Sequence, residues 1–192
     1  MGDVVVHMSM SVDGYVAGPD VSEEHPLGVG GERLHEWMFV DPMDPTDARV
    51  AAEAFSTERV GAVLMGRTTL TVGLRWWGDD GTYRVPCFVV THRPAETLVK
   101  GPTSFAFVTD GLDSALAQAR AAAGDRDVNV MGAATASQLL RAGQVDRVHL
   151  NLVPVLLGDG ARLFDGVPQG VDLERTGTVT SSRADHLTYR VG

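Results

Sequence analysis

Between residues 60 and 155, short apolar segments alternate with segments of helical composition, and this alternation limits the possible folds more than any other feature of the chain. Each apolar segment is short and continuous, which is typical of a strand buried on both faces. Strands that alternate with helices form a largely parallel sheet covered by helices. The sequence therefore predicts an α/β fold. The strands expected here are residues 60–65, 85–91, 105–108 and 128–131, followed by a strand that ends near residue 155.

The two ends of the chain extend this sheet. Residues 4–8 form another continuous apolar strand. Residues 173–191 show no helical pattern but alternate in polarity around a turn near residues 183–185, which predicts a C-terminal antiparallel hairpin. The expected architecture has three layers, with a mixed, mostly parallel sheet flanked by helices. Helices are expected at residues 33–39, 48–55 and 112–123 and after the turns at residues 66 and 132.

Length and composition exclude several classes of function. The 192 residues, 44% of them hydrophobic, suit one domain that spans residues 1–192. The net charge of −9, without any cluster of Lys and Arg, argues against binding to nucleic acids or anionic membranes, and no apolar segment is long enough to span a bilayer. The six histidines are scattered without metal-ligand spacing, so no metal site is expected. The single cysteine, Cys87, lies in an apolar segment, which predicts a buried reduced thiol and a cytoplasmic location.

Three of the expected strands end in residues suited to an anion. The first ends in Gly66, Arg67 and Thr68, where glycine permits close approach, arginine offers a cation and threonine is expected to cap a short helix. The second ends in Thr91, His92 and Arg93, and ligands bind beyond such strand ends in open α/β sheets. A solvated turn with ordinary surface charges would have the same composition.

The third of these turns follows residues 128–131. Gly132, Ala133 and Ala134 let the backbone approach a ligand, and Thr135 with Gln138 has the spacing of a capping box, which predicts that a helix starts at Thr135. An ordinary, tightly packed strand-to-helix turn is the alternative. One long anionic ligand with several phosphates would account for all three turns.

Together these segments resemble the dihydrofolate reductase fold, and more closely its branch that includes the reductase domain of riboflavin biosynthesis. Residues 11–17 (SVDGYVA) resemble the family's loop after the first strand, residues 65–68 (MGRT) its first phosphate-binding turn, and residues 130–135 (VMGAAT) its second. Residues 145–147 (VDR) and 154–164 (PVLLGDGARLF) resemble the riboflavin branch specifically. The resemblance covers nearly the whole chain.

The resemblance implies that NADPH is the cofactor, with its nicotinamide against Val16 and Ala17. It implies hydride transfer to a C=N or C=O bond, for which the protein supplies positioning, exclusion of water and a proton source. The other implied cofactor-binding residues are Gly66 with Arg67, Thr68, Thr91, His92 and Arg93 near the adenosine phosphates, and Met131 with Gly132, Ala133, Ala134 and Thr135 along the pyrophosphate.

Two residues are candidates for the catalytic chemistry. Asn151 is expected to point into the substrate pocket as a polar group, although it could equally be a polar strand residue without that role. Glu36, beside Trp37 on the first expected helix, is the nearest candidate for the acid of the folate enzyme, with an exposed helix carboxylate as the alternative. The riboflavin-type substrate motif is not evident between residues 8 and 66, which leaves the substrate open.

The leading hypothesis is an NADPH-dependent reductase for a small heterocyclic, pterin- or aminopyrimidine-like, or carbonyl substrate, similar to 5-amino-6-(5-phosphoribosylamino)uracil reductase and dihydrofolate reductase. The alternative is a non-catalytic module that senses NADPH or a similar nucleotide. A structural or interaction domain is a third reading, in which Trp76 and Trp77 would form a subunit contact. The resemblance also makes a homodimer an alternative to a monomer.

Overall fold

Strands and helices alternate through the middle of the chain, as the sequence predicts, and the computed structural model describes all of residues 1–192. The strands are β1 (Val4–Ser11), β2 (Tyr15–Ala17), β3 (Val60–Gly66), β4 (Pro86–Val90), β5 (Leu98–Lys100), β6 (Thr103–Val108), β7 (Asp127–Met131), β8 (Arg147–Val153), β9 (Ala161–Arg162), β10 (Leu173–Thr180) and β11 (Asp185–Val191). The helices are the 3-10 helix η1 (Gly31–His35) and the α-helices α1 (Glu36–Phe39), α2 (Pro45–Ala54), α3 (Arg67–Gly73), α4 (Leu112–Ala123) and α5 (Ala133–Arg141).

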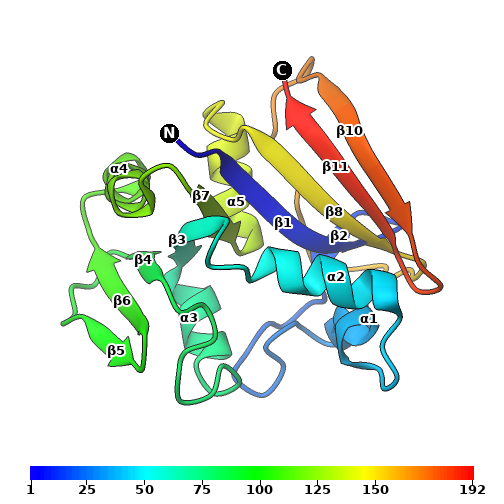
Figure 1. Cartoon of the computed structure of the whole chain (residues 1–192), viewed down its shortest axis with the longest axis horizontal. Helices are drawn as coiled ribbons and strands as arrows, with labels where there is room; N and C mark the ends of the chain where they lie inside the picture. The colour runs from blue at the N-terminus through cyan, green and yellow to red at the C-terminus, as the bar shows by residue number, and fades with distance from the viewer.

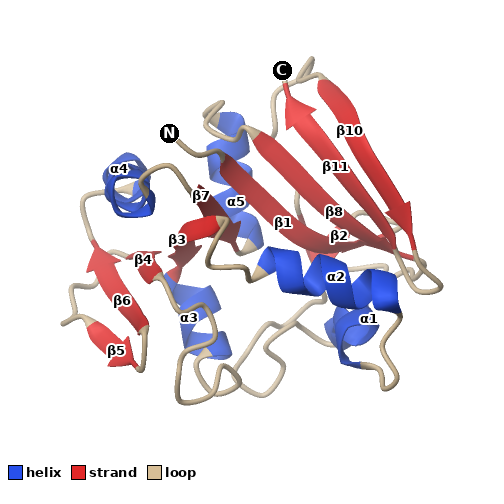
Figure 2. Cartoon of the chain, in the orientation of Figure 1, coloured by secondary structure: helices blue, strands red, loops and turns tan.

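Nine strands form one sheet in the order β10-β11-β8-β1-β7-β3-β4-β6-β5 (Figures 1 and 2). The six strands from β8 to β6 run parallel to one another, while β11 and β5 are antiparallel to their neighbours. The predicted C-terminal hairpin is β10 and β11, at the edge beside β8. A separate pair, β2 and β9, lies beyond the end of β1. The fold is the predicted α/β class with a mixed, mostly parallel sheet.

One face of the sheet is uniformly apolar. Val4 and Val6 of β1 and their counterparts on β3, β7 and β8 pack against α4 and α5 in a core cluster of 20 buried residues. Their free energy of transfer from water is the main term that holds the two helices to the sheet. Figure 1 shows α5 on this side and α2 on the other.

The opposite face is divided into two halves. Over β3, β4 and β6 it is apolar, where Val63, Met65 and Phe105 pack with Leu70 of α3, and Cys87 is buried among them as predicted. Over β1, β7, β8 and β11 the same face carries polar side chains and is covered by α2. None of the helices combines the length and the apolar character that a membrane span requires.

Several helix boundaries differ from the predicted ones. The helix after β7 begins at Ala133 and that after β3 at Arg67, so the N-cap residues are Gly132 and Gly66 rather than Thr135 and Thr68. Both threonines lie in the first turn instead. The segment predicted as one helix at residues 33–39 is the 3-10 helix η1 followed by the single turn α1, and the strands β2, β5 and β9 were not predicted.

The two glycine turns are packed against each other. A Cβ at Gly132 would lie 2.3 Å from the hydroxyl oxygen of Thr69, and a Cβ at Gly66 would lie 3.2 Å from that of Thr135. Each glycine thus makes room for a threonine of the other turn. This contact brings the starts of α3 and α5 together at one edge of the sheet, and it is a reason for glycine at both positions that does not involve a ligand.

Replacement of Gly132 by alanine tests this packing, with Gly111→Ala as the matched control. Both glycines are N-caps with positive φ, 90° and 95°, but a Cβ at Gly111 would meet nothing within 4 Å. We expect Gly111→Ala to lower the free energy of unfolding by about 1–2 kcal/mol through backbone strain alone. Gly132→Ala should cost about 1–3 kcal/mol more, because Thr69 must also move. Equal losses in urea unfolding would contradict the close packing.

Candidate active site

The polar half of the sheet is built by the register of three neighbouring strands. His7 of β1 pairs with His149 of β8, and Asn151 of β8 pairs with His186 of β11. Because side chains alternate along a strand, these residues all project from the same face, toward α2. The rings of His7 and His149 stack with their centroids 5.4 Å apart.

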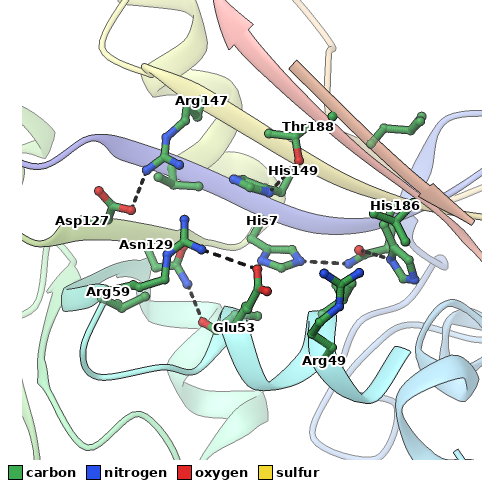
Figure 3. Close-up of a pocket in the computed structure, with 18 of the residues that line it drawn as sticks. His7, Arg49, Glu53, Arg59, Asp127, Asn129, Arg147, His149, His186 and Thr188 are labelled. Carbon is green, nitrogen blue, oxygen red and sulfur yellow. Dashed lines mark hydrogen bonds and ion pairs between the residues drawn. The ribbon is translucent and has the colours of Figure 1, made fainter. Parts of the chain in front are cut away.

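A continuous chain of hydrogen bonds crosses this face beneath α2 (Figure 3). His186 Nδ1 lies 2.8 Å from Asn151 Oδ1, and Asn151 Nδ2 lies 3.1 Å from His7 Nε2. An amide oxygen only accepts and an amide nitrogen only donates, so His186 carries a proton on Nδ1 and His7 accepts on Nε2. The tautomer of His7 is thereby fixed with its proton on Nδ1.

The chain ends at a fully buried carboxylate. Asp47, in the first turn of α2, places Oδ1 2.8 Å from His186 Nε2, and its Oδ2 has no hydrogen-bond partner. A carboxylate without water around it needs such a partner, so one proton is held between Asp47 Oδ1 and His186 Nε2. Trp37 contacts the His186 ring edge-on and donates from Nε1 to Ser9 Oγ at 3.0 Å.

Burial keeps His7, His35 and His149 uncharged at neutral pH. Loss of hydration lowers the pKa of His7 to about 4, with a further decrease from the neighbouring His149. Burial likewise lowers the pKa of His35 to about 4 and, together with Arg147, lowers that of His149. The ring nitrogen Nδ1 of His35 is buried without a partner.

Two cavities meet at this polar wall. A large cleft of about 750 Å³ lies between the sheet, η1, α1, α2 and α3, and a smaller polar pocket of about 140 Å³ lies between α2 and the strands β8 and β11. Figure 3 shows the polar pocket, with Arg49, Glu53 and Arg59 on one side and His149 and Thr188 on the other. The two cavities share His7, Ala54, Asn129 and Asn151 as a common wall.

The three predicted anion-binding turns lie beside the cleft. β7, β3 and β4 are adjacent and parallel, with Met65 paired to Met131 and Gly66 to Val90, so all three turns come to one edge of the sheet. Thr69 and Met131, next to two of these turns, line the cleft, as does Val16 of β2. Two of the three turns thus adjoin the cleft directly, and the third lies at the same edge of the sheet.

The basic side chains at this edge are exposed and have no ion-pair partner. Arg67 lies over the ring of Phe107, with 4.8 Å from its Cζ to the ring centroid. His92 and Arg93 are exposed, and the backbone N–H of Arg93 donates to Thr91 Oγ1 at 3.1 Å, which holds the turn. Of the chain's salt bridges, none involves Arg67, His92 or Arg93, so these groups are available to an anion.

The structure brings most of the predicted site residues together. Val16, Met131 and Asn151 line the cleft, and the remaining predicted cofactor residues lie at or beside the three turns, with Ala17 next to Val16. Asn151 does not present a free amide, because both of its polar atoms are bonded to histidines. Glu36 is exposed at the start of α1 and does not line the cleft, so its catalytic role stays a prediction.

The sequence interpretation missed Asp47, His7 and His186. The available signal was polarity at alternate positions of otherwise apolar strands, with His7 and Ser9 on β1, His149 and Asn151 on β8, and His186 and Thr188 on β11. Such residues share one face and mark a buried polar surface. No group of three or more His, Cys, Asp or Glu side chains is arranged to hold a metal ion.

The chain is similar to one protein family over nearly its whole length. The family model of the RibD C-terminal domain matches residues 3–185, and no curated protein matches the chain. A structure of a protein assigned to riboflavin biosynthesis from Shewanella sp. PV-4 is 23% identical, with a TM-score of 0.76 over 99% of each chain.

Two enzymes of known structure share the fold at lower identity. A diaminohydroxyphosphoribosylaminopyrimidine deaminase/5-amino-6-(5-phosphoribosylamino)uracil reductase from Thermotoga maritima is 14% identical, with a TM-score of 0.66 over 100% of this chain and 57% of that one. Dihydrofolate reductase from Enterococcus faecalis is 15% identical, with a TM-score of 0.61 over 100% of this chain and 97% of that one. The fold is therefore the dihydrofolate reductase-like fold that the resemblance implies.

The pair of Asp47 and His186 can be tested through stability. We expect His186→Ala to lower the free energy of unfolding by about 3 kcal/mol or more, because the Asp47 carboxylate stays buried without a partner. The double variant His186→Ala/Asp47→Ala should be no less stable than His186→Ala, since the unpaired carboxylate is gone. His149→Ala is the control, with a neutral ring and no carboxylate partner. Simple addition of the losses from the two single variants would show that the pair is not coupled.

The lowered pKa values of His7 and His35 predict acid sensitivity. In the unfolded chain His7 and His35 bind a proton near pH 6.5, whereas in the folded chain they bind it only near pH 4. Stability is therefore full above pH 6.5 and falls as the pH drops toward 4, by up to about 3 kcal/mol for each histidine. Urea unfolding between pH 4 and 8 measures this slope, and His7→Gln should flatten it. A stability that does not change between pH 6.5 and 4.5 would contradict the neutral, buried state of these rings.

Proposed function

Because the chain belongs to the RibD C-terminal domain family, we propose that it is an NADPH-dependent reductase that transfers a hydride to a C=N or C=O bond of a small heterocyclic or carbonyl substrate. The observation that carries this proposal is that Thr69 and Met131, beside two of the strand-end turns, line the large cleft together with Val16. A ligand with phosphates at the turns can extend its other end into the cleft.

The residues at this edge fit such a cofactor. α5 begins directly after Gly132 and has no side-chain cap, so the N–H groups of its first turn favour an anion. Arg67, His92 and Arg93 add cationic and hydrogen-bonding groups that no protein carboxylate neutralises. These groups would hold the phosphates, while Val16 and Ala17 would contact the nicotinamide.

The chain's own contribution to the reaction would be to position the reactants and to exclude water. NADPH, when bound, supplies the hydride. The nicotinamide would lie near Val16 and Met131. The walls of the cleft would exclude water and hold the substrate against the nicotinamide ring. Asn151, whose Oδ1 accepts from His186, would keep the tautomer of His7 fixed at the cleft wall.

The names of two similar enzymes support the class of substrate that we propose. The reductase from Thermotoga maritima is named for a uracil that carries a phosphoribosylamino group, and the enzyme from Enterococcus faecalis for dihydrofolate. Both names describe a nitrogen heterocycle. A heterocycle of this kind, or a carbonyl compound, is the substrate that we propose.

The choice of cofactor can be tested by calorimetry with NADPH and NADH. We expect NADPH to bind more tightly, because the turn at Thr91–Arg93 meets a phosphate that NADH lacks. Arg93→Ala should weaken the binding of NADPH by about tenfold and leave the binding of NADH nearly unchanged. Arg175→Ala, an exposed arginine on β10, is the control and should change neither affinity. Equal affinity for the two nucleotides in the unmodified protein would contradict the proposal.

Turnover separates the reductase from a nucleotide sensor. NADPH absorbance at 340 nm is followed while pterins, aminopyrimidines, quinones and aldehydes are supplied. The proposal predicts oxidation with at least one of these classes. Tight binding of NADPH without oxidation by any of them would favour the sensor.

A further inference from the structure

We propose that the substrate of the large cleft is a flat aromatic molecule that is uncharged or cationic and bears no phosphate or other anionic group. This inference rests on the function proposed above and specifies the substrate of the same site. It follows from which side chains line the cleft and from which are missing there.

Aromatic side chains form much of the cleft. Six of them, from α1, α2 and the segment after α3, line it, and these are Trp37, Phe39, Phe55, Trp76, Trp77 and Tyr83. Phe39 and Trp76 are 78% and 64% exposed, although the burial of such side chains is strongly favourable. Exposed aromatic groups around a cavity mark a surface that a ligand covers. A planar ring system would stack on these faces.

The charged side chains of the cleft are acidic. Glu24 and Glu32 line it, neither of them in an ion pair, and no Lys or Arg does. Three histidines also line it: His7, His25 and His35. Burial lowers the pKa of His7 and of His35 to about 4, so these two supply no positive charge at neutral pH, and His25 is exposed next to Glu24 in the sequence. An anionic substituent in the cleft would find two carboxylates and no Lys or Arg, whereas an amine or a ring N–H would be favoured.

The arginines of the adjoining polar pocket do not supply the positive charge that the cleft lacks. Arg59 pairs with Glu53 at 3.5 Å, and Arg147 pairs with Asp127 and Asp3 at 2.6 Å. The wall between the cavities is held closed by the hydrogen bonds of His7 and Asn151. Arg49 is the one arginine of the pocket without an ion pair, and it lies on the far side of that wall from the cleft.

Three probes that share one ring system test the charge preference. Binding of 2-naphthylmethylammonium, 2-naphthalenemethanol and 2-naphthylmethyl phosphate to the whole protein is measured by calorimetry with saturating NADP⁺ present, so that the phosphate-binding turns are already occupied. We expect the first two to bind and the phosphate to bind about tenfold more weakly than the alcohol. Trp76→Ala should weaken the amine and the alcohol together, because both stack on the same surface.

The two glutamates provide the matched variants. Glu24→Gln/Glu32→Gln should weaken the binding of the ammonium probe by about two- to fivefold and leave the binding of the alcohol unchanged. Glu174→Gln, an exposed glutamate on β10, is the control and should change neither. A loss for both probes in the double variant would mean that the glutamates act on the shape of the cleft rather than through charge, and would overturn that part of the inference.

Other outcomes would overturn the inference as a whole. They are tightest binding of the phosphate, equal affinity for all three probes, or no binding by any. Phosphate binding that is lost in Arg49→Ala would instead place an anionic tail in the polar pocket. Because NADPH binding and oxidation are measured separately, failure of this charge order with an active reductase refutes the substrate class alone. The expected order without any NADPH oxidation refutes the reductase alone.

Discussion

The buried contact between Asp47 and His186 is the interaction on which the polar half of the structure depends. A carboxylate removed from water requires a partner, and α2 can cover the sheet only where β11 presents one. The antiparallel register of β11 on β8 places His186 beside Asn151, and the parallel register of β8 on β1 brings in His7. One hydrogen-bonded chain thus joins segments that are up to 179 positions apart in the sequence, His7 to His186. It also forms the wall between the two cavities.

The apolar half of the sheet positions the remainder of the site. β3, β4 and β7 are anchored by their buried faces, so their carboxyl ends meet at one edge. The close packing of Gly132 on Thr69 and of Gly66 on Thr135 joins two of the three turns there. Thr69 then reaches the cleft, so the surface suited to phosphates and the aromatic cleft are built by the same contact.

Sequence patterns were sufficient for the parts of this protein that depend on local periodicity. The α/β class, the C-terminal hairpin, the helix at Leu112–Ala123 and the three strand-end turns all follow from apolar runs and from glycine or threonine at their ends. The exact helix starts did not follow, because Gly66 and Gly132 are the N-caps and Thr68 and Thr135 lie inside the first turn, where Thr135 packs against Gly66. Asp47 and His186 could not be paired in advance, since that contact exists only after three strands and one helix have met.

We propose that the strand-end turns and the aromatic cleft form one site for NADPH and its substrate, and a crystal structure of the protein with NADPH would show whether they do. We expect phosphates at Arg67, Gly132 and the Thr91–Arg93 turn, and the nicotinamide in the cleft beside Val16 and Met131. A nicotinamide that lies outside the cleft, or a cofactor bound elsewhere on the molecule, would contradict it.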